Sequence, residues 1–151
     1  MKPEDFRELI SQAINAEMEA CSFYSALAER AADDALKNIF AGLAADELNH
    51  QSYLQEIMMR GSRALQVEES RDYRFSNALQ LPPLSMDHKP ADGIALAIRK
   101  ELDAMQIYTQ LAQVAWDPQE KKAFLELAKM EKGHKVCLEE IYTNMAFPEI
   151  W

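Results

Sequence analysis

The sequence predicts an all-α fold, a bundle of four long helices made from two similar helical hairpins. One observation behind this prediction is an internal repeat at an offset of 84 residues, as from Ile10 to Ile94. The other is composition. The 151 residues include only four Gly and six Pro, and the helix formers Ala, Leu, Glu and Lys are abundant. We expect one domain over residues 1–151, because a chain of this length can bury its own core.

The first two helices are predicted from capping signals and from apolar residues spaced three or four apart. The first helix is expected to begin at Pro3, since proline is favoured in the first turn, and to end before Asp33. Asp33 is a suitable N-cap for the second helix, which is expected to end near Gly61. The two core-facing stripes comprise Ile10, Ala13, Ile14, Glu17, Cys21, Tyr24, Leu27, Ala28 and Ala31, then Leu36, Phe40, Leu43, Glu47, His50, Leu54 and Ile57.

The second hairpin repeats this arrangement. Its first helix is expected to start near Pro90. Asp117 and Pro118 then predict an N-cap followed by proline at the first helical position, which opens the fourth helix. The stripes of these helices comprise Ile94, Ala97, Ile98, Glu101, Met105, Tyr108, Leu111 and Ala115, then Phe124, Leu127, Glu131, His134, Leu138, Ile141 and Met145.

The connection between the hairpins, residues 61–89, is expected to be a long crossover. Pro82 and Pro83 interrupt any helical pattern in this segment. A helix of about 28 residues is roughly 42 Å long, and an extended chain of similar residue count can span that length. The connector can therefore cross the whole bundle, so that the second and third helices run parallel while each hairpin is antiparallel.

Six polar residues interrupt the predicted apolar stripes near the middle of the four helices. Each half supplies a lone Glu and, further along, a Glu-x-x-His motif. Residues i and i+3 share one helix face, so the Glu and His of one motif can reach the same metal ion. The six candidate metal ligands are Glu17, Glu47, His50, Glu101, Glu131 and His134.

Four carboxylates that converge in a protein interior need counter-charges. Burying an unpaired carboxylate costs several kcal/mol, and like charges at close range raise each other's pKa, so some would stay protonated. Two divalent cations would balance the four negative charges. Mixed Glu and His ligands suit iron or manganese better than zinc. The sequence therefore predicts one site for two metal ions, two Fe ions or two Mn ions.

A single Glu-x-x-His motif in an acidic helical protein is weak evidence, because such pairs are frequent on helix surfaces. The doubled motif is stronger, because two of the three His fall at equivalent places on apolar stripes. The third, His88, is expected at the surface of the connector. Asp46, Glu19 and Asp103 are expected to lie off the ligand face, in solvent.

Charge and cysteine usage indicate what surrounds the protein. A formal net charge of −9 argues against nucleic acid and against an anionic membrane as partners. No stretch suits a membrane span, and the N-terminal residues lack the apolar region of a signal peptide. Cys21 and Cys137 lie in separate predicted helices, so no disulfide framework or cysteine metal knuckle is expected. A reducing cytoplasm is favoured, and buried helix cysteines are usually inert.

Apolar residues outside the four stripes suggest self-association. Leu79, Leu81 and Leu84 in the connector and Ile150 and Trp151 at the C-terminus give more apolar surface than the crossover needs. We expect a homodimer with these segments near the interface.

The pattern of the six candidate ligands on two helical hairpins resembles that of the ferritin-like di-iron superfamily, and within it the rubrerythrin-like branch. The resemblance covers the four helices, roughly 3–60 and 90–145. It implies a ferritin-like four-helix bundle with a non-haem di-iron, or di-manganese, centre that reacts with hydrogen peroxide or dioxygen. It also implies that Tyr24 and Tyr108 lie beside the metals and hydrogen-bond to ligand carboxylates.

The chain differs from rubrerythrins proper in two respects. It lacks their rubredoxin domain with Cys-x-x-Cys pairs, so electrons would come from a separate electron-donor protein. It also has Ala104 where those proteins carry an extra glutamate, three residues after Glu101, and Ala20 at the symmetric place. The remaining set of four Glu and two His is similar to a bacterioferritin-type ferroxidase centre.

Three functions follow as hypotheses. The leading one is an oxidoreductase in which a reduced metal pair delivers two electrons to hydrogen peroxide, or reduces dioxygen, and yields water. The first alternative is a ferroxidase or iron-handling protein, for which Fe(II) is itself the substrate. The second is a non-catalytic metal-binding domain. No Gly-x-Gly-x-x-Gly motif is present, so an organic redox cofactor is not expected.

Overall fold

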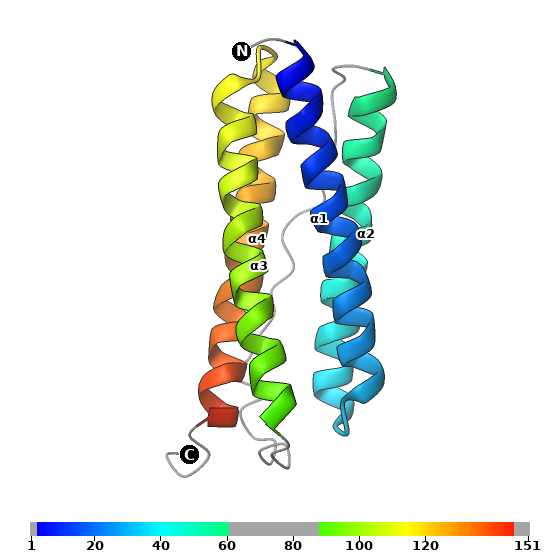
Figure 1. Cartoon of the computed structure of the whole chain (residues 1–151), viewed down its shortest axis with the longest axis vertical. Helices are drawn as coiled ribbons and strands as arrows, with labels where there is room; N and C mark the ends of the chain where they lie inside the picture. Colours follow the sequence, from blue (N-terminus) through cyan, green and yellow to red (C-terminus); the bar gives the residue numbers. More distant parts are fainter. Residues whose placement is uncertain (1–2, 61–87, 147–151) are drawn as a thin grey trace.

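The computed structural model describes the backbone of residues 3–60 and 88–146 and the side chains of residues 5–59 and 91–144. The described residues form no strand and fold into two helical hairpins, and these meet along α1 and α3 (Figure 1). The predicted all-α four-helix bundle is confirmed. The helices are α1 (Pro3–Arg30), α2 (Asp34–Arg60), α3 (His88–Val114) and α4 (Pro118–Ala146).

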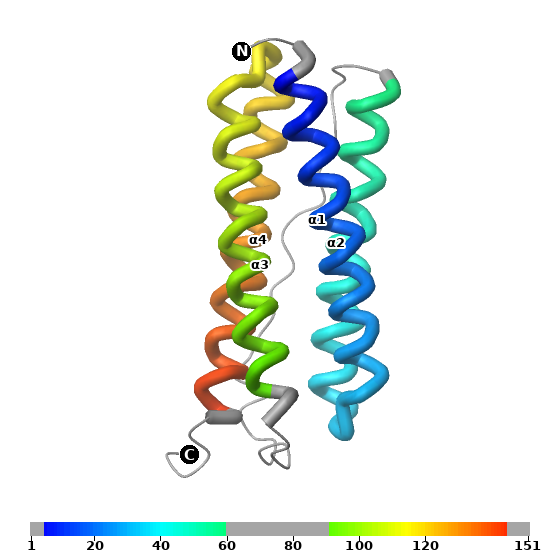
Figure 2. The backbone as a smooth tube through the Cα atoms, viewed as in Figure 1, coloured from blue at the N-terminus to red at the C-terminus, as the bar shows by residue number. Residues whose placement is uncertain are grey.

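The direction of the helices agrees with the predicted topology. Each hairpin is antiparallel, whereas α2 and α3 run in the same direction (Figures 1 and 2). The end of α2 and the start of α3 therefore lie at opposite ends of the bundle (Figure 1). Residues 61–87 lie outside the described residues, as do Ile150 and Trp151. The expectation of a homodimer therefore stays a prediction.

Local capping explains where the helices begin. The Asp33 side chain accepts a hydrogen bond from the backbone N–H of Ala35 at 2.8 Å, and the Asp117 side chain accepts one from Gln119 at 2.9 Å. Both predicted N-caps are confirmed. Helix α3 begins at His88, two residues before Pro90 and so near the predicted start, because a proline in the first turn lacks only an N–H that has no intrahelical partner.

The core consists of two apolar clusters, one toward each end of the bundle. One contains Tyr24, Leu36, Phe40, Leu43, Ile94, Leu138 and Ile141. The other contains Ile10, Leu54, Ile57, Tyr108, Leu111, Phe124 and Leu127. Along every helix the predicted ligand positions fall between the residues of the first cluster and those of the second. The clusters therefore close off a polar layer in the middle of the bundle from water on both sides.

None of the helices in the described part of the chain combines the length and the apolar character needed to cross a membrane.

Candidate metal centre

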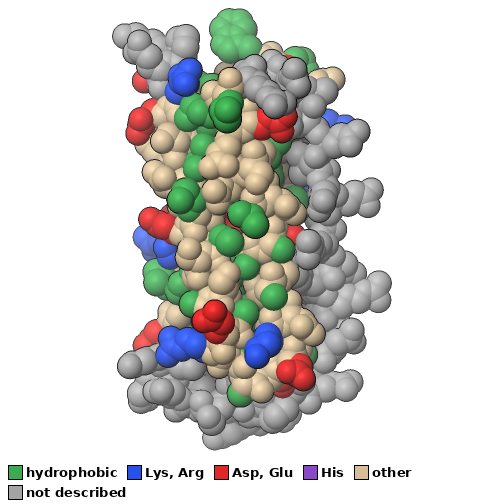
Figure 3. Space-filling model, turned by 90° about the vertical axis from the view of Figure 1, so that its right-hand side faces the viewer, with side chains coloured by type: hydrophobic (Ala, Val, Ile, Leu, Met, Phe, Trp, Pro, Cys, Tyr) green, Lys and Arg blue, Asp and Glu red, His purple; other side chains and the backbone are tan. Residues whose placement is uncertain are grey.

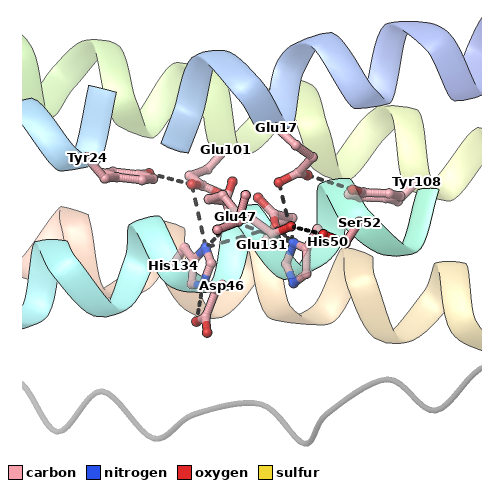
Figure 4. Close-up of polar contacts among 11 residues, drawn as sticks. Glu17, Tyr24, Asp46, Glu47, His50, Ser52, Glu101, Tyr108, Glu131 and His134 are labelled. Atoms are coloured by element: carbon pink, nitrogen blue, oxygen red, sulfur yellow. Dashed lines mark hydrogen bonds and ion pairs between the residues drawn. The ribbon is translucent and has the colours of Figure 1, made fainter. Parts of the chain in front are cut away.

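The structure brings all six predicted ligand residues together in the polar layer. Helices α1 and α3 each supply one glutamate, and α2 and α4 each supply a Glu-x-x-His motif whose two side chains face inward (Figure 4). All six are at least 97 % buried. On the face shown in Figure 3 no histidine is visible among the described side chains, in keeping with the burial of His50 and His134.

The six side chains form two overlapping groups, each able to hold one metal ion. Glu47 and Glu131 belong to both groups. Glu17 and His50 complete one, and the second is completed from the other hairpin. Within each group, one donor atom from every residue lies within 4.8 Å of the others. The groups are Glu17, Glu47, His50 and Glu131, then Glu47, Glu101, Glu131 and His134.

The two halves of the cluster are related by the sequence repeat. Nδ1 of His50 lies 2.9 Å from Oε1 of Glu131, and Nδ1 of His134 lies 3.1 Å from Oε1 of Glu47. Each imidazole therefore faces the glutamate of the other Glu-x-x-His motif. The two rings stack nearly parallel, with centroids 6.2 Å apart and an interplanar angle of 11°. The cluster has an approximate twofold symmetry that relates α1–α2 to α3–α4.

Several buried oxygen and nitrogen atoms of the cluster that could bind a metal have no hydrogen-bond partner among the described residues. Carboxylate oxygens without hydrogen bonds are costly in a protein interior, because a nearby group that makes no hydrogen bond does not replace the water they have lost. Oxygen and imidazole nitrogen atoms that converge in this way fit the binding of a di-metal centre. The orphaned atoms include Oε2 of Glu17, Oε1 of Glu47, both ring nitrogens of His50, Oε2 of Glu101 and both carboxylate oxygens of Glu131.

Burial and mutual repulsion favour protons on two of the four glutamates in the metal-free protein. Burial raises the pKa of Glu47 well above its usual range, and the charges of Glu17 and Glu101 raise it further. Burial and neighbouring carboxylates likewise raise the pKa of Glu131. Glu101 differs: burial opposes its ionisation, but the neighbouring Glu131 and His134 side chains lower its pKa. Without cations, the four glutamates are therefore not all ionised.

Two tyrosines tie the hairpins together at the ligand layer. The Tyr24 hydroxyl on α1 donates a hydrogen bond to Oε1 of Glu101 on α3, and the Tyr108 hydroxyl on α3 donates one to Oε1 of Glu17 on α1 at 2.6 Å (Figure 4). Burial, followed by the charge of the accepting glutamate, raises the pKa of both phenols well above the usual value. Both hydroxyls therefore stay protonated and act as fixed donors to the carboxylates.

The expectation that Asp46 lies in solvent is wrong. Asp46 is only 2 % exposed, and its Oδ2 lies 3.1 Å from Nε2 of His134. Burial disfavours the charged imidazole, but the hydrogen bond with Asp46 and the nearby carboxylate of Glu101 raise the pKa of His134 well above its usual value. The spacing could have revealed this position, because Asp46 is three residues after Leu43 and four before His50, which both face inward.

The other acidic residues and the cysteines agree with expectation. Glu19 and Asp103 are exposed, and Glu19 pairs with Lys100 at 3.3 Å. Both cysteines are free thiols. Burial raises the pKa of Cys137 to about 11, so this thiol stays protonated and unreactive at neutral pH.

Comparisons with known proteins agree with this geometry. A solved structure of a hypothetical protein from Pyrococcus furiosus superposes on the chain with a TM-score of 0.72 at 28% sequence identity, covering 96% of this chain and 94% of that one. No curated protein matches the sequence. The Rubrerythrin family model matches residues 8–83 and 92–150, which include all six residues of the cluster. The chain therefore belongs to the rubrerythrin family.

Proposed function

We propose that this protein is a non-haem di-iron oxidoreductase that reduces hydrogen peroxide, or dioxygen, with electrons from a separate donor protein. The observation that carries the proposal is the buried cluster of four glutamates and two histidines, whose orphaned oxygen and nitrogen atoms converge on two overlapping positions. Membership of the rubrerythrin family supports iron as the metal, and manganese is compatible with the same ligand chemistry.

The proposed ligands divide by symmetry. Glu17 and His50 would hold one ion, and the equivalent pair Glu101 and His134 would hold the other. The carboxylates of Glu47 and Glu131 would serve both ions, because each belongs to both groups. When bound, two ferrous ions would supply the two electrons that, with two protons, convert one molecule of hydrogen peroxide into two of water.

The chain itself would orient the ligand carboxylates, set their protonation and exclude bulk water from the centre. Tyr24 and Tyr108 hold Glu101 and Glu17 in place through buried hydrogen bonds, which preorganises the two outer carboxylates. Because burial raises the pKa of Glu47, a carboxyl proton has to leave when this residue binds a cation. The apolar clusters on both sides of the polar layer keep bulk water from the cluster.

An outside supply of electrons is part of the proposal. The whole chain has two cysteines, Cys21 on α1 and Cys137 on α4, which provide no rubredoxin-type set of four thiolates. We propose that a separate donor protein reduces the oxidised centre before the next turnover.

One observation favours ferroxidase activity as the second candidate. Ala104 occupies the position at which rubrerythrins proper carry an extra glutamate, and Ala20 is its counterpart on α1. Both alanines are 7 % exposed and belong to the apolar clusters. The cluster is thus limited to four glutamates, and it resembles a ferroxidase centre in which Fe(II) is bound, oxidised and passed on.

Anaerobic titration of the iron-loaded, reduced protein distinguishes the candidates. We expect rapid oxidation by one equivalent of hydrogen peroxide per two Fe(II), and slow oxidation by dioxygen. The absorbance of the ferric product measures both reactions. Equally fast oxidation by dioxygen, with ferric iron released and replaced by added Fe(II), would support the ferroxidase instead. Oxidation by neither reagent would contradict both and favour a non-catalytic metal-binding domain.

Removing one tyrosine hydroxyl is expected to slow this reaction. Tyr24→Phe or Tyr108→Phe leaves a buried carboxylate without its donor, and loss of such an orienting partner typically lowers metal affinity or activity about 10- to 100-fold. The rate of oxidation by peroxide and the Fe(II) affinity measure the effect. Tyr142→Phe, a substitution at an exposed position of α4, serves as the control. Unchanged rates and affinities in both buried variants would exclude an orienting role for the hydroxyls.

A further inference from the structure

The two histidines of the cluster differ on the side that faces away from the carboxylates. Nε2 of His134 lies 3.1 Å from Oδ2 of Asp46, and both side chains are 2 % exposed. Nε2 of His50 is equally buried but has no hydrogen-bond partner among the described residues. Figure 4 shows Asp46 below the His134 ring, on the side away from Glu101. Among the described residues, a carboxylate therefore contacts Nε2 of His134 but not Nε2 of His50.

The sequence repeat explains this asymmetry. The offset that relates Glu47 to Glu131 relates Asp46 to Met130. Met130 is buried, at 6 % exposure, and its thioether is at best a weak, uncharged acceptor. The symmetric counterpart of Asp46 therefore cannot hold His50 in the way that Asp46 holds His134.

The contact with Asp46 fixes which nitrogen of His134 is available to a metal. With Asp46 ionised, its carboxylate can only accept a hydrogen bond, and Nε2 of His134 is then the donor. Nδ1, which faces Glu47 at 3.1 Å, is then the nitrogen that can give up its proton and bind a metal ion. A carboxylate behind a metal-binding imidazole fixes its tautomer and ring orientation and makes it a more basic ligand. His50 also turns Nδ1 toward the cluster, but none of the described side chains accepts a hydrogen bond from its Nε2.

We infer that Asp46 is a positioning residue that makes the two metal positions unequal. The position beside His134 binds a divalent transition-metal ion more tightly and fills first, and the position beside His50 fills second and exchanges its ion more readily. The inference rests on the proposed di-metal centre and deepens it, because it assigns an order of loading to two positions that the repeat alone would make alike.

Anaerobic titration of the metal-free protein with Co(II) tests this order. We expect two binding steps by visible absorption, with affinities that differ about 10- to 100-fold. The ring signals of the histidines in the proton NMR spectrum, assigned with His50→Ala and His134→Ala, are expected to show His134 bound in the first step. Neither readout depends on the enzymatic activity of the loaded protein.

Exchanging the two residues provides matched variants. Asp46→Met removes the carboxylate that supports His134. We expect the Co(II) affinity of the position beside His134 to fall about 10- to 100-fold, so that the two binding steps merge. Met130→Asp offers His50 a carboxylate, and the weaker step is expected to tighten. The double variant Asp46→Met/Met130→Asp is expected to reverse the order, so that His50 is bound first. Asp103→Met, which replaces an exposed acid on α3, is expected to change neither step.

Several outcomes would overturn the inference. Two equal steps in the unsubstituted protein, or His134 still bound first in Asp46→Met, would remove the role of Asp46 and leave the di-metal centre standing. A complete lack of Co(II) binding would instead refute the metal centre itself. Circular dichroism tests whether each variant is folded. If Met130→Asp is not folded, Asp46→Asn tests the role of Asp46 instead. It keeps an oxygen acceptor but loses the charge, so it should weaken the first binding step by a smaller factor than Asp46→Met does.

Discussion

Chelation of the metal ions is expected to lower the melting temperature of the protein by about 15–30 °C near pH 7. An ion present at a thousandfold excess over its Kd stabilises the folded state by about 4 kcal/mol, and the proposed centre takes two. In a chain of this length, 1 kcal/mol corresponds to about 2–4 °C. Thermal melts of Fe(II)-loaded and chelated protein under anaerobic conditions, followed by circular dichroism, measure the difference.

The metal-free protein is also expected to become less stable as the pH rises. The pKa values of Glu47 and Glu131 are raised in the folded state from a usual value of 4.5. Above about pH 4.5 the unfolded chain releases protons that the folded chain retains, so the free energy of unfolding falls with pH until the folded pKa values are passed. The raised pKa of His134 acts in the same direction above pH 6.5.

Glu101 opposes this trend only in acid. Its pKa is lowered by folding, so its stabilisation is present above pH 4.5 and is lost as the pH falls below that value. Melts of the chelated protein at pH 5, 6.5 and 8 are therefore expected to show a falling melting temperature. Melts of the metal-loaded protein are expected to show no such fall, because the cations compensate the carboxylate charges.

Neutral isosteres isolate the carboxylates responsible. Glu47→Gln or Glu131→Gln is expected to weaken the pH dependence of the metal-free protein and to reduce the stabilisation by metal. Glu126→Gln, at an exposed position of α4, is the matched control and is expected to change neither. If chelation leaves the melting curve of the unsubstituted protein unmoved at pH 7, the buried-site model is wrong.

The boundaries of the helices could be predicted where they depend on local chemistry. Asp33 and Asp117 cap the helices that follow them by accepting hydrogen bonds from nearby backbone N–H groups. Such caps depend on only a few consecutive residues, so they can be predicted from the sequence. The first residue of α3 is harder to predict, because Pro90 is tolerated anywhere in a first turn and does not mark the residue at which the helix begins. The convergence of the candidate ligands followed from the repeat, which places them on core-facing stripes.

Contacts between the hairpins were beyond the sequence pattern. Periodicity shows that Tyr24 faces inward, but the pairing of its hydroxyl with Glu101 of the other hairpin depends on how the two hairpins are rotated against each other. The interpretation of Asp46 failed for a related reason. A core-facing stripe is at least about 100° wide, so Asp46 and its neighbour Glu47 can both be buried, and the partner that satisfies Asp46 lies on α4.

Substitution of a shared glutamate is expected to disturb both metal ions, whereas substitution of a histidine is expected to disturb one. This follows from the geometry, because Glu47 and Glu131 belong to both four-residue groups while His50 and His134 belong to one each. His50→Ala and His134→Ala are therefore expected to retain about one ion per chain. Glu47→Ala and Glu131→Ala are expected to retain fewer and to lose the reaction with peroxide, which needs two ions acting together.

Metal analysis of the four variants after anaerobic loading and desalting measures this difference, and magnetic coupling between the ions in the unsubstituted protein tests whether they share ligands. Glu139→Ala, which removes an exposed carboxylate paired with Lys135 on α4, is the control and is expected to keep both ions. A carboxylate that belongs to both groups would contribute to both metal positions, so its loss would not be confined to one of them. Two ions that show no coupling, or full occupancy after loss of either shared glutamate, would contradict the shared site and leave two separate mononuclear sites as the model to pursue.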